Sequence, residues 1–254
     1  MKAEITDISY STALTFELVT QYDFFTFGAP TFPSLQKEAI YKTDTNANAV
    51  IIFIQYKLCD HIIGTGSSLK KLWGVPYYRF VIHPKTKLER HIILANLEQM
   101  NTLVFYAAPE FNTIGSLYES LINKKVLSSS TFWSPSGIGT LAEGEKNTIS
   151  YKPDTPYGVL EPGNIKVNNM IRGENLLKVI KERFESNQFE KYNDEKFILL
   201  GDKMLENYLE TFHSAKERKL IDDIIKSRDR IDARDYLSLV STLLYDCYTY
   251  LVAQ

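Results

Sequence analysis

Apolar and polar residues follow two different patterns along this chain of 254 residues. Up to about residue 165, short apolar runs rich in β-branched and aromatic residues alternate with helical patterns, which predicts an α/β domain. From about residue 170 onward, apolar residues recur three or four positions apart almost throughout, which predicts an α-helical subdomain. We therefore expect two domains, residues 1–165 and residues 170–254.

The clearest predicted strand covers residues 50–57, which are apolar on both faces, as in a central strand covered on both sides. A capping box, Thr86 to Glu89, predicts the start of a helix. In the last predicted helix Asp232 is the N-cap, and the apolar stripe continues through Cys247 and Leu251. The other predicted elements are helices at residues 9–22 and 114–123, and strands at 43–45, 76–82, 103–107 and 147–152.

Composition limits the possible functions. The formal net charge of −2 provides no general attraction to nucleic acid, although bound metal ions can offset local acidity in a nuclease. Cys59 and Cys247 lie in no C-x-x-C pattern, so we expect two reduced, buried thiols rather than a zinc site or a disulfide. We see no apolar leader and no apolar run approaching the roughly 20 residues of a membrane span, so we expect a cytoplasmic protein that does not contact a membrane.

Four polar residues surround the predicted central strand. Glu38 and Asp44 precede it, and its apolar run ends in Gln55-Tyr-Lys57. Side chains alternate along a strand, so Gln55 and Lys57 are expected on the same face. Carboxylate and carbonyl oxygens bind Mg²⁺, and a lysine can neutralise charge that develops on a phosphate. The same residues also fit a purely structural interpretation, in which a buried strand ends in a lysine whose ammonium reaches water.

This order of residues resembles the PD-(D/E)xK nuclease superfamily, whose members have the restriction-endonuclease-like fold. More narrowly, Pro33-Ser-Leu-Gln-Lys-Glu38, Asp44 and Phe53-Ile-Gln-Tyr-Lys57 resemble a group of bacterial proteins associated with defence against phage. Pro76-Tyr-Tyr-Arg-Phe80 and Val104-Phe-Tyr-Ala-Ala-Pro109 fit the same resemblance. It covers about the first 165 residues and implies a mixed sheet flanked by helices.

The resemblance assigns a role to each residue. It implies that Asp44 is the central ligand of Mg²⁺ or Mn²⁺, that Glu38 and Gln55 supply further oxygens, and that Lys57 orients the attacking water or stabilises the transition state. Glu17 on the first predicted helix is the alternative first acidic residue, and otherwise it is a solvated helix position. Gln55 stands where many members of the superfamily have Glu, which keeps a non-cleaving domain as an alternative.

Basic residues and histidines near the predicted core complete the candidate site. A local basic patch consists of Arg79, His83, Lys85 and Lys87. It could bind a nucleic-acid backbone, or it could be simply a solvated turn. The resemblance implies that the predicted helix carrying His91 packs beside the metal. The alternative role of His91 is an ordinary histidine, on the helix surface or partly buried, with one hydrogen bond.

Two functions from different classes follow from these observations. The first is a metal-dependent nuclease that cleaves DNA, with RNA not excluded, acting as an effector of anti-phage defence. The second is a degenerate nuclease-like scaffold that acts as a sensor or as a partner-binding subunit of a defence complex, through the helical subdomain. The sequence leaves the oligomeric state open.

Overall fold

The computed structural model describes residues 1–22, 25–27, 48–64, 69–83, 88–153, 155–211 and 215–253. The chain groups into two compact units, and each is built from three separate stretches. The first unit comprises Met1–Leu18, Tyr56–His91 and Phe105–Lys178, and the second comprises Val19–Gln55, Ile92–Val104 and Val179–Gln254. The predicted division between residues 165 and 170 stays a prediction.

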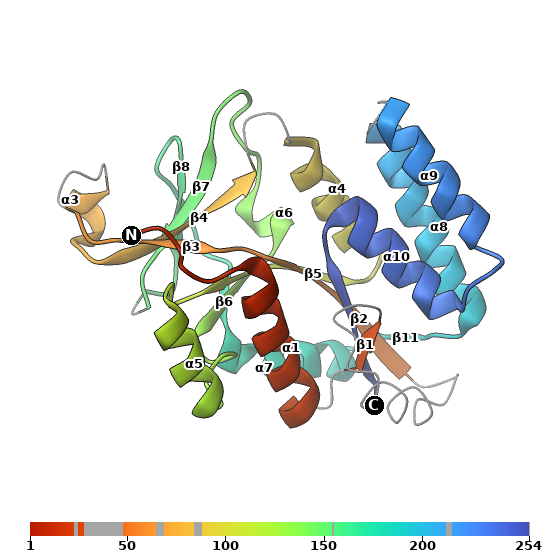
Figure 1. The fold of residues 1–254 in the computed structure, drawn as a ribbon, viewed down its shortest axis with the longest axis horizontal. Helices are drawn as coiled ribbons and strands as arrows, with labels where there is room; N and C mark the ends of the chain where they lie inside the picture. Colours follow the sequence, from red (N-terminus) through yellow and green to blue (C-terminus); the bar gives the residue numbers. More distant parts are fainter. Residues whose placement is uncertain are drawn as a thin grey trace. The chain divides into compact units, whose positions relative to one another are not determined.

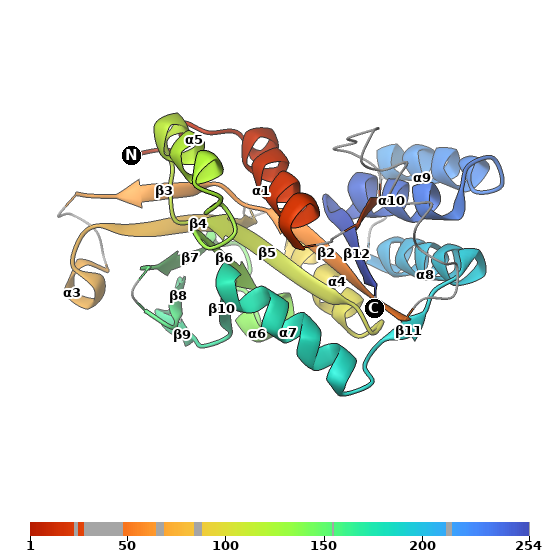
Figure 2. The same ribbon diagram turned by 90° about the horizontal axis from the view of Figure 1, so that it is seen from below.

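The structure is mixed α/β, as the sequence predicts at this coarse level, with sheets flanked by helices (Figures 1 and 2). None of the described helices combines the length and the apolar character that crossing a bilayer requires. In chain order the elements are α1 (Asp7–Tyr22), β1 (Phe25–Phe27), β2 (Asn48–Tyr56), β3 (Cys59–Ile62), α3 (Lys70–Trp73), β4 (Tyr77–His83), α4 (Leu88–Glu98), β5 (Leu103–Pro109), α5 (Ile114–Ile122), β6 (Ser130–Trp133), α6 (Pro135–Ile138), β7 (Asn147–Tyr151), β8 (Gly158–Glu161), β9 (Ile165–Val167), β10 (Met170–Arg172), α7 (Gly173–Glu185), β11 (Glu190–Lys191), α8 (Asp194–Thr211), α9 (Ala215–Ser227), α10 (Ala233–Tyr245) and β12 (Tyr248–Ala253).

The first unit contains an antiparallel sheet in the order β3-β4-β7-β8-β9, and β6 pairs with β5 on one side and β10 on the other. Its core is aromatic: the ring centroids of Trp133 and Tyr151 lie 5.7 Å apart, and those of Phe80 and Trp133 lie 6.2 Å apart. Helices α1 and α5 lie side by side in both views (Figures 1 and 2). Helix α5 begins where the Thr113 hydroxyl accepts a hydrogen bond from the Ser116 N–H, as an N-cap does.

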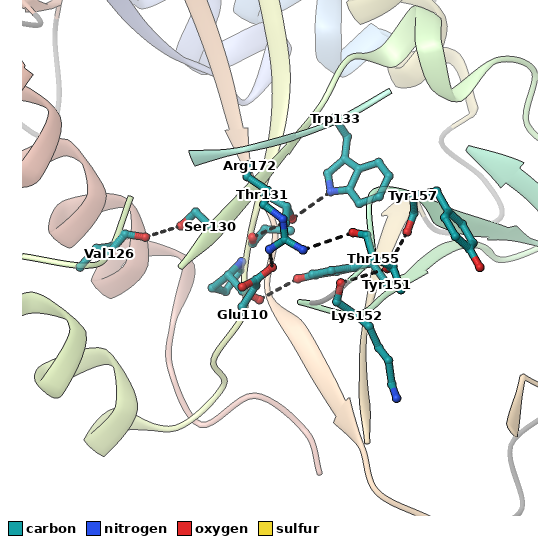
Figure 3. Close-up of polar contacts among 12 residues, drawn as sticks. Glu110, Val126, Ser130, Thr131, Trp133, Tyr151, Lys152, Thr155, Tyr157 and Arg172 are labelled. Carbon is teal, nitrogen blue, oxygen red and sulfur yellow. Dashed lines mark hydrogen bonds and ion pairs between the residues drawn. The ribbon is translucent and has the colours of Figure 1, made fainter. Parts of the chain in front are cut away.

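A chain of polar contacts ties the strands of the first unit together (Figure 3). Arg172, at the end of β10, binds the Glu110 carboxylate at 3.0 Å and donates to the carbonyl of Thr155 at 3.2 Å. The Tyr151 hydroxyl donates to the carbonyl of Pro109 at 2.7 Å, and the Cys59 thiol lies 2.9 Å from the same hydroxyl. Because Tyr151 already donates, the thiol is the donor of the second contact. These bonds satisfy polar groups that would otherwise be costly to bury.

The second unit packs helices α8, α9 and α10 beside strands β2 and β12 (Figure 1). Strand β12 lies between β1 and β2 and is antiparallel to both, and β11 pairs with the beginning of β2. Helix α10 starts at the predicted N-cap, where the Asp232 carboxylate accepts a hydrogen bond from the Arg234 N–H. Cys247 in this unit and Cys59 in the first unit are both buried, as the sequence predicts.

The prediction of one continuous C-terminal helix through Leu251 is wrong. Helix α10 ends at Tyr245, because Asp246 adopts a left-handed backbone conformation with φ of 55°. The next residues form β12, in which Tyr248 pairs with Ile54 and Leu251 with Ile51. A short run of aromatic and β-branched residues fits both periods, and the pairing with β2 decides in favour of the strand.

Candidate functional site

Lys57 directly follows β2, in the part of the chain that belongs to the first unit. Its backbone N–H donates to the carbonyl of Ala107 at 2.8 Å, so this segment runs beside β5. Its ammonium donates to the carbonyl of Ile82 at 2.7 Å and lies 5.0 Å from the centre of the Tyr106 ring. A hydrogen bond and a cation–π contact together restrict the ammonium to one place. The side chain is half-buried, so the charge is not sealed off from solvent.

His91 and Tyr106 form a buried pair behind this lysine. The Nε2 atom of His91 lies 2.9 Å from the carbonyl of Gly139, and Nδ1 lies 2.9 Å from the hydroxyl of Tyr106. A carbonyl can only accept, so Nε2 carries the proton and Nδ1 accepts the hydrogen bond from Tyr106. The two rings are nearly parallel, with an interplanar angle of 6°.

The electrostatics of the pair favour a neutral imidazole. Burial is the largest cause and lowers the pKa of His91 below its ordinary value. The hydrogen bond to Gly139 opposes this shift, and the nearby charge of Lys57 lowers the pKa further. Both ring nitrogens are engaged, so protonation of His91 would require the Tyr106 hydroxyl to turn and accept a hydrogen bond from Nδ1. Lys57 is therefore the charged group of this cluster, and His91 and Tyr106 are the residues that position it.

Gln55 belongs to the second unit, where it is fully buried in β2. Its side-chain Nε2 donates to the carbonyl of Tyr245 at 3.1 Å, and this bond fixes the orientation of the amide. The Oε1 atom is also buried and has no hydrogen-bond partner among the described residues. Such an unpaired oxygen costs about 1–3 kcal/mol. An amide oxygen of this kind has the chemistry of a Mg²⁺ ligand.

The two other predicted metal ligands, Glu38 and Asp44, lie outside the described residues, as does the predicted short strand at residues 43–45. Within the described ranges, no group of three or more His, Cys, Asp or Glu side chains is arranged to hold a metal ion. Gln55 fits the oxygen chemistry of a magnesium site. The complete ligand set stays a prediction.

Glu17, the alternative first acidic residue, is neither solvated nor on the surface. It is 1% exposed on α1, and its Oε2 accepts a hydrogen bond from the backbone N–H of Val126 at 2.8 Å. Burial raises the pKa of this carboxyl group, and hydrogen bonds from the backbone of Val126 and Leu127 oppose the shift. In the described structure, Glu17 thus anchors the turn that precedes β6.

Only part of the predicted basic patch can be located. Arg79 is half-buried in β4, directly across from Asp60 on β3 and Ser150 on β7. His83 is the last residue of β4, opposite Asn147. Lys85 and Lys87 lie outside the described residues. The binding of a nucleic acid by these four residues stays a prediction.

The sequence patterns did not reveal the contacts that Tyr106 and Gly139 make in the cluster around Lys57. Tyr106 stands in an apolar run that indicates only a core strand, and Gly139 follows the short helix α6. A tyrosine in such a run is a usable signal, because a buried hydroxyl almost always needs a hydrogen-bond partner.

Comparison with protein-family models, with curated proteins and with solved structures found no significant match.

Proposed function

We propose that this chain is a metal-dependent nuclease that cleaves phosphodiester bonds in DNA, and that it acts as an effector of bacterial anti-phage defence. Asp44, Glu38 and Gln55 would hold Mg²⁺ or Mn²⁺. When bound, the metal supplies Lewis-acid activation of the phosphate and a nucleophilic water at neutral pH. Lys57 would stabilise negative charge that develops on the phosphate.

The observation that carries the proposal is the unpaired, buried oxygen of Gln55. A hydrogen bond to Tyr245 already fixes the amide, so its oxygen is held in one place at no further entropic cost. A cation is a natural partner for such an oxygen, because carbonyl oxygens are hard ligands. The fixed ammonium of Lys57 adds support, because a restrained charge loses less energy to reorganisation during the reaction.

The second candidate function is a scaffold that does not cleave nucleic acid and that binds a partner subunit of a defence complex. The neutral side chain of Gln55 favours it, because an amide binds divalent cations less strongly than a carboxylate. Large apolar side chains on the helices of the second unit favour it as well: Leu199, Ile225 and Leu243 are 51%, 47% and 45% exposed. Exposed apolar side chains can contribute to protein interfaces.

The first experiment incubates the purified protein with plasmid DNA and with RNA in Mg²⁺, Mn²⁺ or EDTA. Lys57→Met removes the ammonium and should lower the cleavage rate by about 10²–10³-fold. Lys71→Met is the matched control, because Lys71 is an exposed lysine of the same unit. Asp44→Asn should abolish metal-dependent cleavage without lowering the melting temperature.

Three results would separate the candidates. Cleavage of DNA that EDTA stops and that Lys57→Met abolishes supports the nuclease. Cleavage of RNA alone would move the substrate to RNA. No cleavage of either polymer, together with no heat of Mn²⁺ binding in calorimetry for the wild type or for Gln55→Glu, would refute the nuclease and favour the scaffold.

A further inference from the structure

The second unit contains a pocket of about 280 Å³ that none of the predicted nuclease residues lines. Helix α8 forms one wall with Lys196, Leu199, Leu200 and Lys203, which share a face because they are three or four residues apart. Gln99, Met100 and Asn101, in the turn after α4, form another wall with Glu190 and Tyr192. The volume lies just below the usual range of small-molecule sites, so the pocket suits a small metabolite rather than a polymer.

One wall is held rigid by its own hydrogen bonds. Asn101, with φ of 59°, donates to one oxygen of Glu190 at 3.4 Å and accepts from Arg183 at 3.3 Å. Lys196 binds the other oxygen of Glu190 at 3.1 Å. The charge of the Glu190 carboxylate is therefore neutralised by Lys196 from the α8 wall. The site is formed before any ligand arrives.

Two hydrogen-bond donors at the pocket are not used inside the protein. Tyr192 is 7% exposed and its ring stacks on Phe197 at 5.4 Å, but its hydroxyl makes no hydrogen bond to another described residue. Burial, and next the charge of Glu190, raise the pKa of Tyr192, so the hydroxyl keeps its proton. The ammonium of Lys203 is exposed and forms no ion pair within the described ranges.

The charge of the pocket is positive. Two lysines and one glutamate line it, which gives a net charge of +1, and Lys196 already neutralises Glu190. The remaining positive charge is that of Lys203. Lys203 and Tyr192 supply polar groups that can orient a ligand, and Leu199, Leu200 and Met100 add apolar side chains to the same pocket lining.

We propose that this pocket binds a small organic anion. A carboxylate or phosphate group of the ligand accepts hydrogen bonds from the Tyr192 hydroxyl and the Lys203 ammonium, and a short apolar body packs against Leu199, Leu200 and Met100. The inference does not rest on the nuclease proposal, because no residue of the pocket belongs to the predicted catalytic set.

Calorimetry and ligand-observed NMR on the full chain test the proposal with four probes: phenyl phosphate, benzoate, inorganic phosphate and neutral benzyl alcohol. We expect phenyl phosphate or benzoate to bind at least about fivefold more tightly than benzyl alcohol, and the comparison of the two anions identifies the preferred head group. Tyr192→Phe should weaken anion binding about tenfold, since a hydrogen bond to a charged group is lost. Lys203→Met should weaken it about fivefold, since an exposed charge contributes less.

Two matched controls test the specificity of these effects. Lys226→Met removes an exposed lysine of α9, and Tyr118→Phe removes an exposed hydroxyl of α5, so both should bind like the wild type. Unchanged binding in Tyr192→Phe and Lys203→Met would overturn the proposal, as would benzyl alcohol binding as tightly as the anions or no binding of any probe. Inorganic phosphate binding as tightly as phenyl phosphate would overturn the role of the apolar body.

Discussion

Substitution of Glu17 tests how much a buried carboxylate contributes to the stability of the fold. Glu17→Ala removes the acceptor of the Val126 N–H and leaves a cavity in a site that is 1% exposed. The lost hydrogen bond and the cavity together should lower the free energy of unfolding by about 2–4 kcal/mol. Glu17→Gln keeps a carbonyl oxygen for Val126, so it should remain within about 1 kcal/mol of the wild type at pH 4.5.

Glu17→Gln should also differ from the wild type in how its stability depends on pH. Burial raises the folded-state pKa of Glu17 above its ordinary value of 4.5, so between the two pKa values the folded state binds more protons than the unfolded state. The contribution of this group to the free energy of unfolding is therefore fully present below pH 4.5, and it is lost as the pH rises through the folded-state pKa. Each pH unit within that window costs the wild type about 1.4 kcal/mol. A glutamine side chain does not titrate, so the free energy of unfolding of the Glu17→Gln variant increases relative to that of the wild type as the pH rises.

Urea unfolding from pH 4.5 to pH 8 measures this difference directly. Glu119→Gln, which changes an exposed carboxylate on α5, is the matched control and should follow the wild-type profile. Parallel profiles for the wild type and Glu17→Gln would refute the reasoning. A loss of DNA cleavage in Glu17→Gln, with stability unchanged, would instead make Glu17 the first acidic residue of the active site.

Two further predictions concern packing and ion pairing. A Cβ atom at Gly201 on α8 would lie 2.7 Å from the ring of Tyr236, so Gly201→Ala should destabilise the protein by about 1–3 kcal/mol, whereas Gly115→Ala on α5 meets nothing within 4 Å and should stabilise it by about 0.5 kcal/mol; thermal melts of the two variants decide this, and equal melting temperatures would contradict it. Arg172→Met removes the 3.0 Å ion pair with Glu110 and should lower the free energy of urea unfolding by about 1–2 kcal/mol, whereas an unchanged urea midpoint would show that the ion pair in Figure 3 contributes no stability.

Local signals predicted the elements that depend on local contacts. The periodicity of residues 9–22 gave α1, the apolar run at 50–57 gave β2, and the carboxylate of Asp232 gave the start of α10. Strand β12 was missed because its residues fit a helix equally well. Only its pairing with Phe53 and the neighbouring residues of β2, almost two hundred positions away in sequence, selects the strand.

In the candidate site, too, the sequence could not predict which residues contact Lys57. Alternation along a strand tells which face Lys57 occupies, but it cannot tell that Tyr106 lies beneath its ammonium. That contact exists because the backbone of Lys57 pairs with Ala107, and this pairing brings β5 alongside. His91 then completes the cluster through a second long-range contact, the hydrogen bond to Gly139. A motif can therefore nominate a charged group from sequence, whereas the residues that fix its position follow only from the pairing of strands.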